Sequence, residues 1–225
     1  MDRVTVLIPA YNEEEAIGES VRAALAMPGI EEVIVIDDGS DDETPFVAHD
    51  AGARVLQLDR NLGKGAALNA GLAETDADII LMIDADLGPT AAETRRLLEP
   101  VIAGHADMAI AVMKAPVGHR GGFGIVMKLS RWAVRRYGGV HVTAPLSGQR
   151  AIRRKVIEDI GGFARGFGVE TALTIDALRK GYRIVEVPLP IAHRLTGRDW
   201  RGFVHRARQF RDILRAVWPR RKKEF

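Results

Sequence analysis

The chain has 225 residues, of which 47% are hydrophobic and 28% charged, the ordinary composition of a globular domain that buries a substantial core. It contains no cysteine, so disulfides and thiolate metal sites are excluded. The first residues lack a signal-peptide pattern and no apolar run approaches about 18 residues, so we expect a cytoplasmic protein. The formal net charge of +2 hides an asymmetry, because residues 194–225 carry eleven Arg or Lys against three acids and leave −6 for residues 1–193.

Apolar runs alternate with helical stripes along the first third of the chain. Strands rich in Val, Ile and Leu are predicted at Arg3–Ile8, Glu32–Ile36, Arg54–Leu58 and Ala77–Ile83. Helices are predicted between them, at Glu14–Ala26, Asp42–Ala51 and Gly63–Glu74. Strands that alternate with helices indicate an α/β fold, with one mostly parallel, Rossmann-like sheet and helices on both of its faces.

Beyond Asp86 the alternation is less regular. Helices are predicted at Thr90–Ile102, Gly121–Tyr137 and Glu170–Lys180. Strands are predicted at Asp107–Met113 and Tyr182–Val187. Thr90 would be the N-cap of the first helix, and Pro188 would end the last strand. No linker interrupts the chain, so we expect one domain over residues 1–202, with a first half at 1–90 and a second half at 91–202.

Residues 203–225 form a basic, amphipathic segment. Within Phe203–Trp218 apolar residues recur at helical spacing, at Phe203, Ala207, Phe210, Leu214 and Val217. Such a helix, followed by the basic run Arg220–Lys223, suits the anionic inner face of a membrane, to which the protein would be peripheral. It equally suits packing on the domain or in a homodimer interface. No nucleic acid partner is expected, because the basic segment lacks a reading motif and the rest of the chain is acidic.

The run Ile79–Leu87 reads IILMIDADL and includes two carboxylates separated by one residue. Alternate residues of an extended chain face the same side, so Asp84 and Asp86 would converge just past the end of a buried strand. Ligands of open α/β sheets bind at this end of the strands, and two carboxylates there would hold Mg²⁺ or Mn²⁺ together with a diphosphate. The alternative is a solvated turn whose acids cap the next helix.

Polar loops follow the first two strands as well. The loop Pro9–Glu14 offers Tyr11 for contact with a nucleotide base, or simply Asn12 as a helix N-cap. The loop Asp37–Asp42 holds four acids. A capped helix accounts for one of them but not for the first two together, which suggests a cationic or hydroxyl-rich partner.

The loop Asn61–Gly65 follows the third strand. Its small residues allow a close approach of the backbone to a ligand, and Lys64 supplies a point charge. The loop matches neither a P-loop nor a dinucleotide-binding fingerprint. Together with the acid pair, these loops describe a nucleotide pocket that leads to a metal-held diphosphate.

Four motifs in this order resemble those of family 2 glycosyltransferases with the GT-A fold. They read PAYNEE at 9–14, DDGSDD at 37–42, RNLGKGAALNAG at 60–71 and DADL at 84–87. The resemblance implies transfer of a sugar from a UDP- or GDP-sugar with Mg²⁺ or Mn²⁺. It implies a donor site made of Pro9, Ala10, Tyr11, Glu13, Asp38, Gly39, Asn61, Lys64, Asp84 and Ala85. Asp84 and Asp86 would bind the metal, which would offset charge on the departing diphosphate.

The second half resembles two groups of these transferases. SGQRAIRR at 147–154 is similar to a segment of polyprenyl-phosphate sugar transferases of the dolichol-phosphate mannose synthase type, in which the arginine faces the acceptor phosphate. GFGVE at 166–170, VP at 187–188 and AHR at 192–194 are similar to glucosyl-3-phosphoglycerate synthases. Both groups use a phosphorylated acceptor. We therefore expect, since arginine suits phosphate geometry, an acceptor site made of Ser147, Gly148, Arg150, Arg194 and Arg198.

These resemblances imply three catalytic residues, Asp86, Arg150 and Glu170. Glu170 would be a base or would position the acceptor, and an acceptor phosphate that is already ionised needs no base, which favours positioning. In glucosyl-3-phosphoglycerate synthases the histidine equivalent to His193 helps to hold the metal. His193 would therefore be a third metal ligand or, alternatively, a surface residue after the last strand.

The leading hypothesis is a metal-dependent glycosyltransferase that moves a hexose to a polyprenyl phosphate. A small soluble phosphate, as in glucosyl-3-phosphoglycerate synthases, is the alternative acceptor. A third hypothesis is a nucleotide-sugar-binding module without catalysis.

Overall fold

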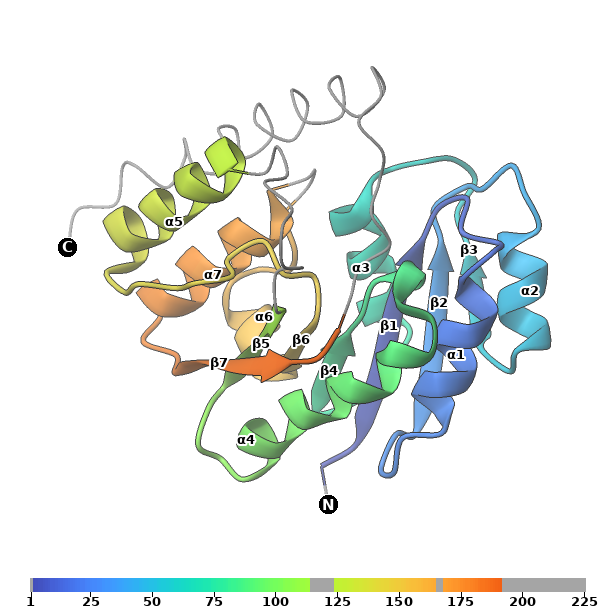
Figure 1. Ribbon diagram of the computed structural model, residues 1–225, viewed down its shortest axis with the longest axis horizontal. Helices are drawn as coiled ribbons and strands as arrows, with labels where there is room; N and C mark the ends of the chain where they lie inside the picture. The colour runs from blue at the N-terminus through green and yellow to red at the C-terminus, as the bar shows by residue number, and fades with distance from the viewer. Residues whose placement is uncertain (1, 114–123, 165–167, 192–225) are drawn as a thin grey trace.

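The computed structural model describes residues 2–113, 124–164 and 168–191 (Figure 1). The strands in these ranges are β1 (Val4–Ala10), β2 (Glu32–Asp37), β3 (Arg54–Gln57), β4 (Ile79–Met82), β5 (Met108–Met113), β6 (Arg150–Arg153) and β7 (Ile184–Leu189). The helices are α1 (Ile17–Leu25), α2 (Thr44–Asp50), α3 (Lys64–Ala73), α4 (Leu98–Ile102), α5 (Gly124–Gly138), α6 (Arg154–Asp159), α7 (Val169–Arg179) and the 3₁₀ helix η1 (Ala85–Leu97). None of these helices is long and apolar enough to cross a bilayer.

Part of the predicted site lies outside the described residues. This holds for His193, Arg194 and Arg198, and for the amphipathic segment at 203–225. It also holds for the first two residues of the GFGVE motif at 166–170. Those interpretations stay predictions.

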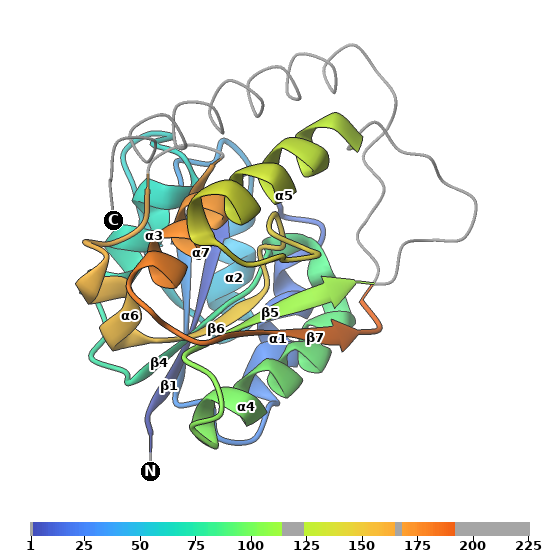
Figure 2. The ribbon, with the colours of Figure 1, turned by 90° about the vertical axis from the view of Figure 1, so that its left-hand side faces the viewer.

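The strands form one sheet in the order β3-β2-β1-β4-β6-β5-β7. Neighbouring strands are parallel except at β6, which runs antiparallel to both β4 and β5. In Figure 2 the last two strands of this order, β5 and β7, run side by side in the same direction. The expected α/β fold with a mostly parallel sheet is therefore confirmed.

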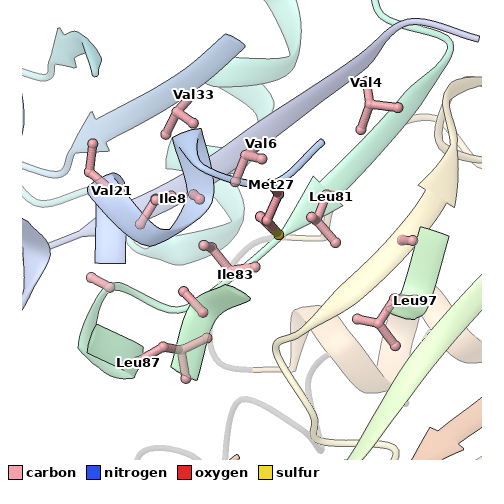
Figure 3. Packing of buried hydrophobic residues seen from close by; sticks show 14 of the residues in the cluster. Val4, Val6, Ile8, Val21, Met27, Val33, Leu81, Ile83, Leu87 and Leu97 are labelled. Carbon is pink, nitrogen blue, oxygen red and sulfur yellow. The ribbon is translucent and has the colours of Figure 1, made fainter. Parts of the chain in front are cut away.

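Helices cover both faces of the sheet, as the continuous apolar runs of the strands require. Alternate residues of β1 enter different clusters: Val4, Val6 and Ile8 pack with α1 and η1, whereas Leu7 packs with the layer of α3, α5 and α7. Figure 3 shows the first cluster, with Val21 of α1 close to Ile8. Burial of each such side chain stabilises the fold by about 1.5–3 kcal/mol.

The prediction of an α-helix over Thr90–Ile102 was wrong for most of this range. The chain forms the 3₁₀ helix η1 over most of this range, and only Leu98–Ile102 is α-helical. Gly88 interrupts η1 with non-helical angles (φ 52°, ψ −139°), and Pro89 follows it. Thr90 is not an N-cap, because its hydroxyl donates to the carbonyl oxygen of Leu87 at 2.7 Å.

Two further features differ from the prediction. The strand β6 and the short helix α6 are absent from it, because β6 has four residues, two of them arginines, and so shows little apolar alternation. The strand β7 continues through Pro188 to Leu189. Pro188 is tolerated because β7 is an edge strand, where one missing N–H leaves no inner neighbour without a partner.

Candidate active site

The carboxyl ends of β1, β2 and β4 lie at one edge of the sheet, because these strands are parallel neighbours. The first residue of β6, Arg150, pairs with Met82 at the end of β4. Since the two strands are antiparallel, the loop before β6 lies beside the loop after β4. This edge therefore brings the motif at 147–150 next to the acid pair at 84–86.

A cluster of charged and polar groups joins four segments at this edge. The Lys64 ammonium, at the start of α3, lies 2.6 Å from Oδ1 of Asp84 and 2.8 Å from Oε1 of Glu170. Gln149 donates from Nε2 to Oδ2 of Asp84 at 2.6 Å. The hydroxyl of Ser147 lies 3.2 Å from Oε1 of Gln149 and fixes the amide. Both oxygens of Asp84 are thus held, each by a different loop.

The charge of Lys64 is stabilised by its neighbours. Burial alone would lower the pKa of Lys64, but Asp84 and Glu170 raise it well above the usual lysine value. The side chains of Lys64 and Glu170 are 24% and 10% exposed, so solvent screens this attraction only in part. The guanidinium of Arg150 also interacts with Asp84 and Glu170, so two cations balance the two carboxylates of the cluster.

Gly148 packs directly against this cluster. A Cβ atom at residue 148 would lie 2.5 Å from both carboxylate oxygens of Asp84 and 2.7 Å from Nζ of Lys64. Real Cβ contacts essentially never fall below 3.0 Å, so any larger residue must displace one of these charged groups. The close approach of the loop therefore requires glycine.

The structure does not place Arg150 in the open acceptor site that we expected. Its side chain is fully buried and donates to the carbonyl oxygens of Ser147 (2.8 Å) and Pro145 (2.9 Å) and to Oγ1 of Thr174 (2.8 Å). Burial lowers the pKa of Arg150 to about 10, against the effect of nearby carboxylates, and leaves it charged at neutral pH. Arg150 thus ties the loop before β6 to α7 and does not face an acceptor.

The acids after β2 are satisfied inside the protein. Asp38 accepts from the backbone N–H groups of Leu62 at 2.7 Å and Gly63 at 2.8 Å. Asp37 accepts from the hydroxyl of Ser40. Asp38 therefore holds together the loops after β2 and β3, and through them the start of α3, whereas Asp37 closes the turn within the loop after β2.

Gly39 and Asn61 meet where the same two loops touch. Gly39 has a φ of 75°, in the left-handed region that favours glycine. A Cβ atom there would lie 2.7 Å from the carbonyl carbon of Arg60 and 2.9 Å from the backbone nitrogen of Asn61. These two predicted donor residues thus belong to a tightly packed pair of loops.

The loop after β1 differs in part from the prediction. Pro9 and Ala10 belong to β1 itself, and Tyr11 beyond them is 43% exposed. Asn12 is not an N-cap: it has a φ of 55°, and its Oδ1 accepts from a backbone N–H of the loop after β2 at 2.9 Å. Glu13 donates its backbone N–H to a hydroxyl at the start of α2 at 2.7 Å.

Ser20 of α1 fixes the backbone next to Asp84 and Asp86. Its hydroxyl donates to the carbonyl oxygen of Ala85 at 2.7 Å and accepts from the N–H of Gly88 at 2.8 Å. The backbone is extended at Asp84 (φ −78°, ψ 151°), and η1 begins at the next residue. Asp84 and Asp86 therefore come from a strand end and a helical turn, which corrects the expectation of one extended strand.

The described residues fit a divalent cation that arrives with its ligand. Within residues 2–113, 124–164 and 168–191, no group of three or more His, Asp or Glu forms a metal site. Mg²⁺ is usually held by one or two carboxylates and by phosphates of the substrate, and Asp84 and Asp86 offer that number.

Sequence reasoning missed two residues that shape this site, Gln149 and Ser20. Gln149 stands inside the motif at 147–154, and its full burial distinguishes it from a surface amide only in the structure. Ser20 lies on a helix without any pattern that marks it, and it is fully buried as well.

Comparisons with known proteins agree with this geometry. A model of the family described as glycosyl transferase family 2 matches residues 5–161. Glycosyltransferase AglJ of Haloferax volcanii is 31% identical over 209 residues, which cover 88% of this chain and 66% of that protein. Undecaprenyl-phosphate mannosyltransferase of Micrococcus luteus is 32% identical over 211 residues, which cover 87% of this chain and 86% of that protein.

A solved structure extends the likeness to three dimensions. Glucosyl-3-phosphoglycerate synthase of Mycobacterium tuberculosis, in complex with Mn²⁺, UDP and phosphoglyceric acid, matches with a TM-score of 0.83 and 28% identity. The match covers 100% of this chain and 80% of that one. The GT-A fold is therefore confirmed, and the chain belongs to glycosyl transferase family 2.

Proposed function

We propose that this glycosyltransferase moves a hexose from a UDP- or GDP-sugar to a phosphate-bearing acceptor, with the help of Mg²⁺ or Mn²⁺. The observation that carries the proposal is the contact of Lys64 with both Asp84 and Glu170 at the strand ends. This cluster combines a cation for a diphosphate with carboxylates for a metal. UDP and Mn²⁺ in the structural neighbour support the same donor and cofactor.

In this proposal the donor lies along the loops after β1, β2 and β4. Tyr11 offers an exposed ring for the nucleoside. Asp38 holds the loop that positions Lys64, whose ammonium would contact the diphosphate. Asp84 and Asp86 would hold the cation, with His193 as a further ligand. When bound, the cation would neutralise the charge that develops on the leaving diphosphate.

The residues of the second half position these groups. Gln149 fixes the orientation of Asp84, and Arg150 holds the loop that carries Gln149. Glu170 lies next to Lys64 at the start of α7, and we assign it the positioning of the acceptor. Arg194 and Arg198 are our candidates for contact with the acceptor phosphate.

The acceptor we favour is a polyprenyl phosphate, because a relative that covers most of the chain is named undecaprenyl-phosphate mannosyltransferase. With a polyprenyl phosphate acceptor, we also propose peripheral attachment to an anionic membrane through residues 203–225. The second candidate is a small phosphorylated acid, which phosphoglyceric acid in the structural neighbour supports. Weaker vesicle flotation by a chain cut after Gly202 than by the full chain would support the lipid acceptor.

The test is release of nucleoside diphosphate from UDP-glucose or GDP-mannose with Mn²⁺. The full chain is offered undecaprenyl phosphate in detergent or 3-phosphoglycerate, and Asp86→Asn is the control. We expect release with one donor and acceptor pair, and loss of release with EDTA. Tight UDP binding without release from any pair would instead favour a nucleotide-sugar-binding module.

A further inference from the structure

Helix α5 presents a basic and aromatic face that the active site does not use. Lys128, Trp132, Arg135 and Arg136 follow one another at spacings of four, three and one, so they share one side of the helix. All four are exposed, Trp132 by 54%, and Val140 just beyond the helix is 50% exposed. We call these five residues the α5 face.

The opposite side of α5 is packed on the protein. Val126, Ala133 and Val134 are buried in the cluster that also includes residues of α7. Ser130 is fully buried, and its hydroxyl lies 3.1 Å from that of Thr171 on α7. Figures 1 and 2 both show α7 between α5 and the sheet. The α5 face therefore points away from the sheet.

The cations of the α5 face are available to an external anion. Helix α5 contains no acidic residue. In the part of the chain that the structure describes, no ion pair involves Lys128, Arg135 or Arg136. Trp132 packs edge-on against Tyr137, with ring centroids 5.7 Å apart, and Arg136 lies 5.5 Å from the same ring. The indole is therefore held in place while it stays exposed.

We propose that the α5 face docks on an anionic lipid bilayer. Lysine and arginine near a membrane surface are attracted by anionic headgroups. Tryptophan prefers the boundary between headgroups and acyl chains, where its apolar ring and its N–H both find partners. Exposed Val140, just beyond the end of α5, adds apolar surface to this face. A nucleic acid would neutralise the charges but offers no apolar phase for this valine, so the bilayer fits the whole face better.

The position of α5 connects this surface with the active site. Ser130 touches Thr171, the residue after Glu170, and a helix with its side chains is about 10–12 Å across. Headgroups on the outer side of α5 would therefore lie about one helix diameter from the site. A phosphate carried by a lipid would be presented at that distance. This link rests on the proposed acceptor, whereas bilayer binding itself does not.

The test is flotation of the full chain with vesicles of phosphatidylcholine alone or mixed with phosphatidylglycerol. We expect binding that needs the anionic lipid. Since each basic residue near the surface adds to binding, K128E/R135E/R136E should lower the partition coefficient at least about tenfold, and W132A by a smaller factor. The matched control is R95E/R96E, which reverses two exposed charges on η1, on the other face of the sheet.

Equal flotation of the wild type and K128E/R135E/R136E would overturn the proposal, and so would an absence of flotation by the wild type. Loss of RNA binding by the same variant, without any vesicle binding, would assign the face to nucleic acid instead. Thermal unfolding and UDP binding of each variant show that the fold and site are intact. Failure of UDP binding with flotation retained would contradict the proposed function and leave the α5 face in place.

Discussion

Two acidic strand ends at the same edge of the sheet differ in what holds their carboxylates. After β2, Asp38 accepts from two backbone N–H groups, those of Leu62 and Gly63. After β4, Asp84 accepts from two side chains, the ammonium of Lys64 and the amide of Gln149. Backbone donors move only if the loop moves, whereas side-chain donors can turn aside when a ligand arrives.

We therefore regard the region after β2 as a structural scaffold, and the region after β4 as a site whose internal contacts a ligand can replace. The region after β2 should respond to substitution mainly through the free energy of unfolding, because its hydrogen bonds join two loops. The region after β4 should respond mainly through binding and turnover, because its charges face one another across loops. The following substitutions are ways to break this division, from the largest expected effect to the smallest.

Asp86→Asn removes a carboxylate from the region after β4. We expect kcat/KM for sugar transfer to fall at least about 10³-fold, because a metal supplies several kcal/mol of stabilisation to the leaving group. The midpoint of thermal unfolding should stay close to that of the wild type. Turnover assays with Mn²⁺ measure the first effect, and more than a tenth of the activity retained would contradict our assignment of Asp86.

Gly148→Ala forces a methyl group against Asp84 and Lys64, at 2.5 and 2.7 Å. We expect turnover to fall about 100-fold, the typical effect of misplacing a reacting group by about 1 Å. The matched control is Gly71→Ala, whose new Cβ would lie 2.6 Å from Cδ1 of Ile36 in the core. The control should lower stability and leave turnover nearly unchanged. The reverse result would mean that the cluster tolerates displacement.

Asp38→Asn tests the scaffold region. An amide oxygen can replace only one of the two carboxylate oxygens, so one of the two part-buried backbone N–H groups loses its partner. We therefore expect the free energy of unfolding in urea to fall by about 2 kcal/mol. The KM for the donor should change less than the activity changes in Asp86→Asn. Unchanged stability with a large rise in KM would place Asp38 on the donor instead.

Asp42→Asn should have the smallest effect, and that effect depends on pH. Burial alone would raise the pKa of Asp42, but hydrogen bonds from Thr44 and Glu14 hold it below the usual 3.8. A lowered pKa in the folded state adds stability above pH 3.8 that is lost as the pH falls through the folded value. We expect the variant to be less stable by about 1 kcal/mol at neutral pH. Urea unfolding in strong acid should no longer separate the two proteins, and a constant difference would argue against this pKa.

The first half of the fold could be predicted because β1, β2 and β4 are largely apolar runs buried on both faces of the sheet, and the shorter, half-exposed β3 keeps two apolar residues at its centre. The strand β6 could not, since its burial depends on Arg150, whose guanidinium donates hydrogen bonds to Pro145, Ser147 and Thr174. An arginine in a sequence gives no sign that such acceptors will surround it. Its predicted contact with an acceptor failed for this reason.

The site shows the same limit. Asp84 and Lys64 could be singled out because strand ends and glycine-rich loops are marked in the sequence. The contact of Lys64 with Glu170 could not, because it joins segments that only the crossing of α7 over the sheet brings together. The N-caps predicted at Asn12 and Thr90 do not form. The side chain of Asn12 bonds to a backbone N–H of another loop, and the hydroxyl of Thr90 bonds to a nearby carbonyl oxygen.

The most direct test of the account is calorimetric titration of UDP into the wild type and into Asp86→Asn, each with Mn²⁺ and with EDTA. If the acid pair holds a cation that grips the diphosphate, Mn²⁺ should tighten UDP binding to the wild type at least about tenfold, which is 1.4 kcal/mol. The same gain should be absent from Asp86→Asn. An equal gain in both proteins would mean that the metal and the nucleotide meet somewhere other than at the end of β4.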